Sequence, residues 1–295
     1  MTDPAPEPTP AELTAELVAL LEVAAVDDDR FEGRRKKGGV GRVFGGQVIA
    51  QALASAERTV PEDREAHSLH AYFLRGGSED FPIEFRVERD FDGGSFSNRR
   101  VIASQQGRPI LNLAASFHKR EPGIGHQDPM PDVPGPAELE NERQLLVSHD
   151  ERMPEIMRQR LIRPSYIEVR PTEPLRWMGV IGGEPAMNTW FRAAGRLGDD
   201  AKLHRAALAY ASDLMLLGTS MQPYRVDWNP AKFQGASLDH ALWFHDDFRA
   251  DEWLLYATDS PWAGRARGFN RGRIYTESGR LIADVAQEGL LRALG

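Results

Sequence analysis

The sequence predicts an α+β fold made of two similar units, on three observations. Each half of the 295-residue chain opens with a helical pattern and continues as short β-type runs. Glycine-rich turns join these runs, which favours antiparallel pairing. Two stretches recur in one order: HAYFL at His70 resembles HALWF at His240, and GRPILNLAASF at Gly107 resembles GRLIADVAQEG at Gly279. A long helix followed by a curved antiparallel sheet, present twice, is the layout of a double hotdog fold; two unrelated α+β domains are the alternative.

In the first half, residues 11–26 space their leucines as one helical stripe, and residues 48–56 fit a second, more buried helix that ends before Pro61. The runs HSLHAYFL, PIEFRVERDF, SNRRVIASQQ and PILNLAASF then predict strands. Residues 1–10 are rich in proline and are predicted to be disordered. We therefore expect the N-terminal hotdog over residues 11–119.

Residues 120–137 have the proline and glycine content that is typical of a linker. Beyond it we expect a helix over residues 137–159 and another from about 200 to 217. The runs IEVRP, NTWFRAAG, DHALWFH, EWLLYATDS, GFNRGRIY and RLIADVAQ predict strands. The C-terminal hotdog is therefore expected over residues 138–295.

Composition and charge restrict the class of protein. The formal net charge of -8 disfavours general binding to nucleic acid, which needs a concentrated basic surface. The chain has no cysteine, which excludes disulfides, thiolate nucleophiles and cysteine-bound metals. Its N-terminus is acidic and proline-rich, and no segment has the length and apolarity of a membrane span. We expect a cytoplasmic protein with no membrane partner.

Several common motifs are missing from the sequence. A serine hydrolase of the GxSxG type is not indicated, since GTSMQ at Gly218 and GASLD at Gly235 lack the closing glycine. No GxxxxGK[ST] phosphate loop is present, and GGVGRVF has Phe44 where GxGxxG requires glycine. The sequence therefore offers no support for binding of nucleoside triphosphates or dinucleotides.

The histidines do not have the spacing of a metal site. His67 with His70, and His240 with His245, would point to opposite faces if they lie on strands. We therefore expect no metal, and we interpret these histidines as either exposed or satisfied by structural hydrogen bonds.

Asp213 is a carboxylate within an apolar run, AYASDLMLLG. On a helix it would lie beside Tyr210, Leu214 and Leu217. A carboxylate removed from water needs partners or takes up a proton. The alternative is an N-cap, with Ser212 or Asp213 starting a short turn over LMLLG.

Gln287 and Ser237 are the other polar candidates. If RLIADVAQ is a strand, alternation places Gln287 on its more apolar face, where it needs a hydrogen-bond partner. The matching position in the first half is Ala115, so the role of Gln287 is not duplicated. Ser237 lies just before the run DHALWFH, and an ordinary turn hydroxyl is its alternative.

The chain also resembles a known family. The motifs GRVFGGQVIAQAL, HSLHAYFLRGG, DGGSFSNRRV and IASQQGRPILNLAASF, with YASDLMLL, DHALWFH, EWLLY, ARGFNRGRIYT and VAQEG, are similar to those of acyl-CoA thioesterase II, from about Leu17 to Leu291. The resemblance implies a double hotdog that hydrolyses fatty acyl-CoA to fatty acid and CoA without a cofactor, and a homo-oligomer, either dimer or tetramer.

The resemblance also implies a catalytic set. In that family an aspartate, a threonine or serine and a glutamine of the second hotdog orient and activate the attacking water. The matching residues are Asp213, Ser237 and Gln287. The hydroxyl position is commonly threonine, so Ser237 keeps the hydroxyl and lacks the methyl group that restricts its rotamers.

Arginines are the expected partners of the CoA phosphates, and an apolar channel is expected for the acyl chain. By position the candidates are Arg99, Arg100, Arg265 and Arg271, although a solvated strand face is the alternative for each. The glycine-rich basic segment 33–42 either gates the entrance or simply connects two elements.

Two other functions stay open at this stage. A non-catalytic acyl-CoA binding protein would keep the channel and lose the water-activating residues, yet all three are chemically competent here. A hotdog-type enoyl-CoA hydratase would need an aspartate and a histidine paired near a strand-to-helix turn, and the matching segments of the sequence show no such pair.

Overall fold

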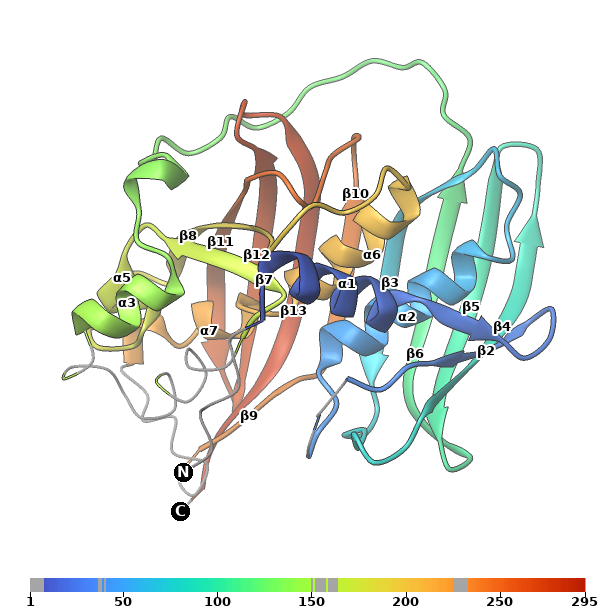
Figure 1. Cartoon of the computed structure of the whole chain (residues 1–295), viewed down its shortest axis with the longest axis horizontal. Coiled ribbons are helices and arrows are strands. Elements are labelled where there is room, and N and C mark those ends of the chain that lie inside the picture. Colours follow the sequence, from blue (N-terminus) through green and yellow to red (C-terminus); the bar gives the residue numbers. More distant parts are fainter. Residues whose placement is uncertain are drawn as a thin grey trace.

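The strands form a single sheet that curves around two central helices. The computed structural model describes residues 8–36, 39, 41–149, 151, 158, 164–224 and 233–294. Within them the sheet has 13 strands in the order β1-β2-β4-β5-β6-β3-β10-β13-β12-β11-β8-β7, with β9 paired to β13. Figure 1 shows α1, α2 and α6 on one face of this sheet. The predicted double hotdog is confirmed by this arrangement.

The first unit follows the predicted order. Its elements are α1 (Pro10–Leu21), β1 (Val23–Ala25), β2 (Arg30–Gly33), α2 (Gly45–Glu57), β3 (Glu65–Phe73), β4 (Ile83–Asp92), β5 (Phe96–Gln105) and β6 (Arg108–His118). Helix α1 begins at Pro10 because Thr9 and Glu12 form a capping box, so the end of the segment predicted to be disordered is helical. Residues 1–7 lie outside the described residues. The predicted helix over 11–26 is too long, because residues 23–25 pair with β2.

The second unit repeats this order with additional short helices and one additional strand, β9. Its elements are η1 (Pro136–Glu138), α3 (Glu142–His149), β7 (Ile167–Pro171), α5 (Pro174–Trp177), β8 (Ala186–Ala193), α6 (Ala201–Ser212), α7 (Leu216–Thr219), η3 (Gln222–Tyr224), β9 (Phe233–Ser237), β10 (Asp239–Phe244), β11 (Leu254–Gly264), β12 (Arg267–Thr276) and β13 (Leu281–Ala293).

Two predicted helices are interrupted in the structure. The helix expected over 137–159 is broken after η1, because Leu139 is extended and the side chain of Asn141 accepts from the backbone N–H groups of Arg143 and Gln144 to start α3 afresh. Much of its second half lies outside the described residues. The helix expected to reach residue 217 ends at Ser212, whose carbonyl oxygen accepts a hydrogen bond from the hydroxyl of Tyr256.

Strands β3 and β10 join the two units along a local two-fold axis. His70 pairs with Ala241, Leu69 with Leu242, and Ala71 with His240. His70 also pairs with Ala114 in β6, and Ala241 with Ala286 in β13. Ala114 and Ala286 hold the same position in the repeated GRPILNLAASF and GRLIADVAQEG stretches.

These pairs correct the alignment predicted from the HAYFL and HALWF stretches. The counterpart of Ala241 is His70, so the counterpart of His240 is Leu69 and not His70. A shift of one residue moves a side chain to the other face of a sheet. Accordingly His240 and Leu69 are both fully buried, whereas His70 is exposed.

The segment between the units, residues 119–135, contains no helix or strand. It crosses above the sheet at the top of Figure 1. The indole nitrogen of Trp190 donates to the carbonyl oxygen of Pro134 at 2.9 Å, and the side chain of Gln127 bonds the backbone of Gly279 and Leu281. A division of the chain into hotdogs at residues 120–137 stays a prediction.

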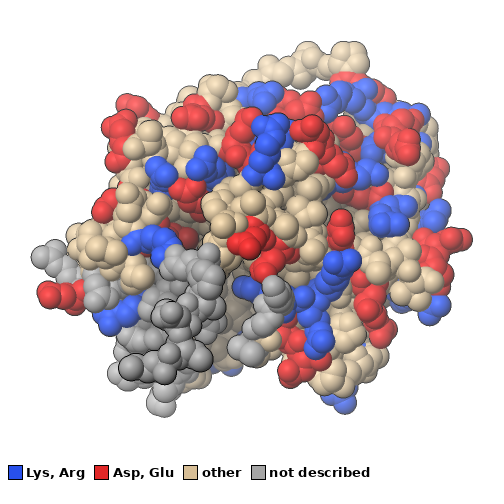
Figure 2. All heavy atoms as spheres, viewed as in Figure 1, with Lys and Arg blue, Asp and Glu red and all other residues tan. Residues whose placement is uncertain are grey.

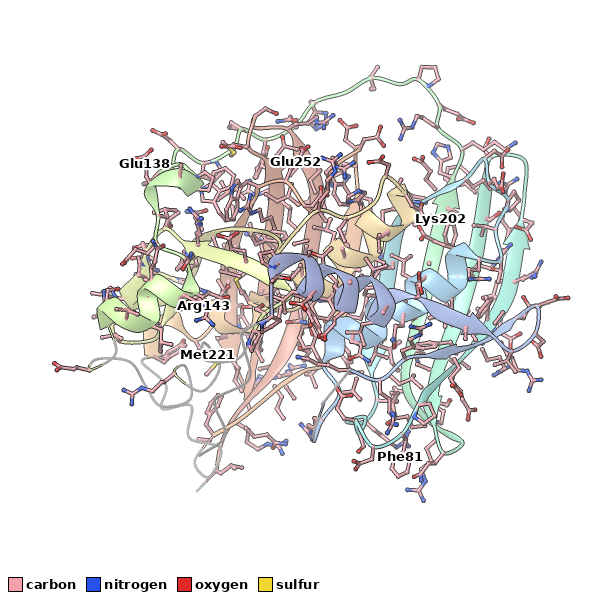
Figure 3. All side chains as sticks on the ribbon, viewed as in Figure 1. Phe81, Glu138, Arg143, Lys202, Met221 and Glu252 are labelled. Atoms are coloured by element: carbon pink, nitrogen blue, oxygen red, sulfur yellow. The ribbon has the colours of Figure 1, made fainter. Side chains whose placement is uncertain are left out.

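Helices α2 and α6 pack antiparallel, which places the start of α2 against the end of α6. At one end Arg205 forms a 2.7 Å ion pair with Glu57, and Lys202, labelled in Figure 3, lies at the start of α6. At the other end a Cβ atom on Gly46 would collide with the carbonyl oxygen of Tyr210. Glycine at this position therefore permits the close approach that brings the N-terminus of α2 to Asp213.

Candidate active site

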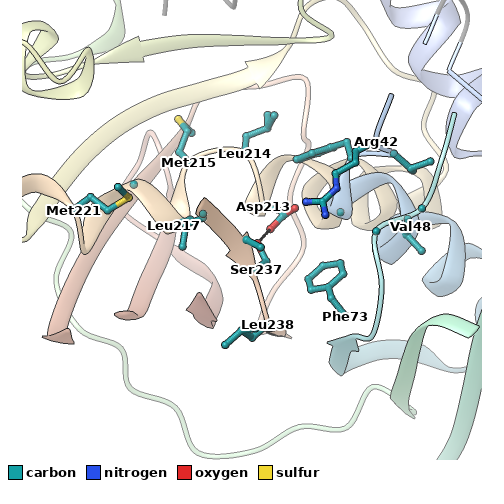
Figure 4. Close-up of a pocket in the computed structure, with 18 of the residues that line it drawn as sticks. Arg42, Val48, Phe73, Asp213, Leu214, Met215, Leu217, Met221, Ser237 and Leu238 are labelled. Atoms are coloured by element: carbon teal, nitrogen blue, oxygen red, sulfur yellow. Dashed lines mark hydrogen bonds between the residues drawn. The ribbon is translucent and has the colours of Figure 1, made fainter. Parts of the chain in front are cut away.

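An apolar cavity of about 670 Å³ lies between the start of α2, the end of β3, the α7 region and β9. This volume is within the range of ligand pockets, about 300–1,000 Å³. Figure 4 shows Asp213 and Ser237 in the middle of the lining. The first unit contributes Arg42, Val43, Phe44, Gly45, Val48, Phe73, Leu74, Arg75, Gly76, Gly77 and Ile110. The second contributes Trp177, Met178, Gly179, Ile181, Met187, Asp213, Leu214, Met215, Leu217, Gly218, Met221, Gln222 and residues 235–238.

Asp213 ends α6, and its carboxylate is almost entirely buried. The side chain is 4% exposed. Its Oδ1 accepts from the side-chain amide of Gln287 at 2.6 Å and from the hydroxyl of Ser237 at 3.4 Å. The backbone N–H of Gly46, in the first turn of α2, also donates to this carboxylate. The N-cap alternative is wrong, because Asp213 is the C-cap of α6 and Met215 precedes α7.

Burial determines the charge state of Asp213. Removal from water raises the pKa of this carboxyl to about 6, and the hydrogen bonds from Gln287, Gly46 and Ser237 act in the opposite direction. The positive end of α2 adds to the field that favours a negative charge here. The result is a carboxylate that is ionised at neutral pH and more basic than one in water.

Gln287 and Ser237 reach Asp213 from two neighbouring strands. Gln287 is fully buried on the inner face of β13, as strand alternation predicts. Ser237 ends β9, and the chain resumes as β10 after Leu238, whose side chain also lines the cavity. The structure thus brings together all three residues chosen from the sequence. Gln287 itself lies behind Asp213, outside the cavity lining.

Sequence reasoning missed a fourth polar residue, His240. It is completely buried, and its Nδ1 lies 3.1 Å from Nε2 of Gln287 and 3.9 Å from Oδ1 of Asp213. Its Nε2 lies 2.9 Å from the hydroxyl of Ser212. Burial lowers the pKa of His240 to about 3, so the ring is neutral. The alternation of HALWF, which places His240 on the side of Leu242 and Phe244, was the available signal.

The four arginines proposed for substrate binding lie outside the lining of this cavity. Arg99 is buried and donates to Thr59 and Asp92, and Arg265 occupies the turn between β11 and β12 with a φ of 49°. Arg100 and Arg271 are ion-paired to Asp90 and Asp259 respectively. Their part in binding stays a prediction.

Two other arginines, Arg42 and Arg75, do line the cavity. Among the described residues that line the cavity, these two arginines are the cationic side chains and Asp213 is the anionic one. Neither guanidinium group forms an ion pair with a described residue, and Nη1 of Arg75 donates to the carbonyl oxygen of Pro109.

Surface charge and metal-binding capacity add little to the site. On the face shown in Figure 2, basic and acidic residues are intermingled among the described residues. Within the same part of the chain, no group of three or more His, Asp or Glu residues is placed to hold a metal ion. No helix in the described ranges is both long and apolar enough to cross a bilayer.

Comparison with known proteins identifies the family. The family model described as acyl-CoA thioesterase matches residues 165–290, and the model of the acyl-CoA thioesterase N-terminal domain matches residues 34–118. Human acyl-coenzyme A thioesterase 8 is 39% identical, in an alignment that covers 96% of this chain and 91% of that protein. The chain belongs to the acyl-CoA thioesterase family. Each family model covers one of the two units.

Two solved structures have the same fold. Acyl-CoA thioesterase II TesB2 from Mycobacterium marinum superimposes with a TM-score of 0.77 at 39% identity, covering 95% of this chain and 99% of that one. A hot dog protein from Alicyclobacillus acidocaldarius reaches a TM-score of 0.73 at 17% identity, covering 95% and 98% of the two chains. The second likeness concerns the fold alone.

Proposed function

We propose that this thioesterase hydrolyses fatty acyl-CoA to a fatty acid and CoA by attack of a water molecule that Asp213 activates. The observation that carries the proposal is the buried Asp213 carboxylate, which faces an apolar cavity and accepts hydrogen bonds from Gln287 and Ser237. A base of raised pKa beside an apolar channel suits an acyl thioester, which brings a long chain and an electrophilic carbonyl carbon.

The proposed reaction needs no covalent enzyme intermediate. Asp213 takes a proton from water while the oxygen of that water bonds to the thioester carbonyl carbon. The carbonyl oxygen becomes an oxyanion, which backbone N–H groups at the start of α2 stabilise. The C–S bond then breaks, and the thiolate of CoA receives the proton that Asp213 holds. Ser237, which lines the cavity, orients the water, and Gln287 holds the carboxylate from behind.

The lining of the cavity supports one direction for the substrate. Arg42 and Phe73 lie to one side of Asp213 in Figure 4, and Met215 and Met221 lie to the other. Guanidinium groups bind phosphates well, and flexible methionine side chains adapt to an alkyl chain. We therefore place the CoA phosphates at Arg42 and Arg75 and the acyl chain along the methionines.

Neither rival function is favoured. The aspartate–histidine pair that a hydratase needs is present as Asp213 and His240, but His240 is fully buried and lies outside the cavity lining, so it does not face a substrate. A protein that only binds acyl-CoA has no need of a buried carboxylate at the carbonyl position. In a protein without catalytic activity, burial of this carboxylate would only lower the free energy of unfolding.

We also propose that the protein acts in the cytoplasm as a homo-oligomer, either dimer or tetramer. The absence of cysteine suits a reducing compartment. The exposed aromatic side chain of Tyr72, on the central strand β3, supports association of the sheet's outer face with a second copy of the chain. Sedimentation at several concentrations measures the oligomeric state.

The test is release of free CoA thiol from acyl-CoAs of increasing chain length. Wild type is expected to hydrolyse the longer chains, and Asp213→Asn to lose about 10³-fold in kcat, the middle of the range for general bases. The counterpart variant Arg58→Asn, at the matching end of α2, is the control and should keep wild-type kcat. Wild-type kcat in Asp213→Asn would overturn the role of Asp213, and background rates in the wild type would overturn the function.

A further inference from the structure

The hydrogen bonds around His240 have a fixed direction. Ser212 donates its single hydroxyl hydrogen to the carbonyl oxygen of Ala209 at 3.0 Å, so it can only accept from the histidine. Nε2 of the neutral His240 ring therefore carries the proton, and Nδ1 is a bare acceptor. That acceptor faces Nε2 of Gln287 at 3.1 Å.

Gln287 consequently donates both hydrogens of its amide group, one to Asp213 and one to His240. Its Oε1 is buried and has no hydrogen-bond partner among the described residues. Nothing on the oxygen side therefore holds the amide in place. Its orientation depends on the two contacts made by Nε2.

The contact with Asp213 does not by itself fix the orientation of the Gln287 amide once Asp213 is protonated. While the carboxylate is ionised, it accepts from Nε2 and opposes rotation of the amide. Once Asp213 has taken the proton from water, its Oδ1 can instead donate to Oε1 of a rotated Gln287. The bare Nδ1 of His240 prevents this rotation, because the rotated amide would set oxygen against a second acceptor.

We propose that His240 is a positioning residue that keeps Gln287 donating to Asp213 throughout the catalytic cycle. The inference rests on the proposed function of Asp213 as the base. His240 acts through Gln287, since the imidazole lies outside the cavity lining and touches no substrate. The neutral form of the ring is the one required, and the low pKa that burial gives His240 preserves it.

The first unit supplies a natural replacement. Leu69, the counterpart of His240, is fully buried beside Ala115, the counterpart of Gln287. Leucine is thus compatible with this position of the fold. His240→Leu removes the acceptor, whereas His240→Asn keeps an acceptor oxygen near the place of Nδ1. His70→Leu, at an exposed histidine of the neighbouring strand, is the matched control.

The first experiment measures kcat and its pH dependence for these variants. In His240→Leu, rotation of Gln287 stabilises protonated Asp213, so the acid limb of the profile is expected to shift up by about one pH unit. We expect kcat to fall about 10- to 100-fold with KM unchanged, His240→Asn to recover most of it, and His70→Leu to match wild type. The other ionisable group beside Asp213, Tyr256, has a pKa raised well above 10 by burial and does not titrate in this range.

A double-mutant cycle separates positioning from a general structural role. If His240 acts through Gln287, His240→Leu costs little further activity in the Gln287→Ala background. Independent, multiplying losses would overturn the proposal, as would an unshifted pH profile in His240→Leu.

A second readout does not depend on activity. The side-chain amide protons of Gln287, assigned by their loss in Gln287→Ala, are followed by NMR. Exchange with water is expected to be at least tenfold faster in His240→Leu than in wild type, because one hydrogen bond is lost and the amide rotates. Equal exchange rates would overturn the inference even if the chain hydrolysed no thioester, so its failure is distinct from that of the proposed function.

Discussion

The two units share six strands in the same order, with β9 added in the second, yet they fill one buried layer with different chemistry. In the first unit Arg99 pairs with Ala115, which pairs with Leu69. In the second, Asn270 pairs with Gln287, which lies against His240. The first layer serves stability: Arg99 ties Asp92 to Thr59, and two apolar side chains fill the rest. Only the second layer continues into hydrogen bonds with a buried carboxylate, that of Asp213.

The ends of the central helices differ in the same way. Arg58 caps α2 and Asp213 caps α6, both with αR backbone angles. Arg58 is exposed and lies over the ring of Phe31, whereas Asp213 is buried against the other helix. The antiparallel packing of α2 and α6 brings a helix N-terminus to Asp213. The first unit therefore supplies a backbone N–H group that donates to the Asp213 carboxylate of the second.

The largest effect that would sharpen this comparison concerns the charge of Asp213. A base must be ionised to accept a proton, so kcat/KM should fall with decreasing pH below about 6, the pKa that burial gives this carboxyl. From the plateau at pH 8 to pH 5 the expected loss is about tenfold, the ratio of the ionised fractions. Rates at saturating and limiting substrate across this range provide the measurement.

A second buried acid needs a control in this experiment. Burial raises the pKa of Glu57 to about 7, against the opposing effect of Arg205. Glu57 lies at the far end of the α2–α6 pair, where it contacts Arg205 and not the cavity. Glu57→Gln is expected to keep the acid limb in place. If the limb moved or vanished in that variant, Asp213 would not be the group that controls the rate.

A further effect is expected from the first unit's side of the cavity. Arg42→Ala and Arg75→Ala should each raise KM for acyl-CoA about tenfold and leave kcat unchanged, because they remove a contact made equally in the ground and transition states. Acyl-pantetheine, which lacks the nucleotide phosphates, is the matched substrate and should show no change. Equal losses on both substrates would contradict the proposed direction of the substrate.

Much of this difference between the two units could be predicted from the sequence. The positions of the strands along the chain and the two central helices follow from hydrophobic periodicity and turn residues, which depend on local sequence. Asp213 and Gln287 were visible as polar side chains in apolar runs, and Gln287 as a residue without a polar counterpart. The helix ends were less predictable, because Ser212 is held by Tyr256, a tertiary contact made from a distant strand.

The register of the strand pairs and the partners of the side chains could not be predicted from the sequence alone. The likeness of HAYFL to HALWF favoured a match of His240 with His70, and only the strand pairs place His240 opposite Leu69. The roles of the arginines depend on what lies across the neighbouring strand, which a single sequence does not reveal. Arg100 and Arg271 are each paired with a carboxylate on the neighbouring strand. Arg42 is identified as a candidate for substrate binding because it lines the cavity, which its position in the sequence does not reveal.

The smallest expected effect tests where the two units are alike. Arg100 and Arg271 occupy matching positions, since Arg100 pairs with Ala114 and Arg271 with Ala286. Each forms an exposed ion pair with a carboxylate on the adjacent strand, and such pairs contribute about 0–1 kcal/mol. We expect Arg100→Ala and Arg271→Ala to lower the free energy of unfolding by similar small amounts in urea titrations and to leave KM for acyl-CoA unchanged. A rise in KM for one variant alone would show that substrate binding distinguishes these positions and would support the role in CoA binding predicted from the sequence.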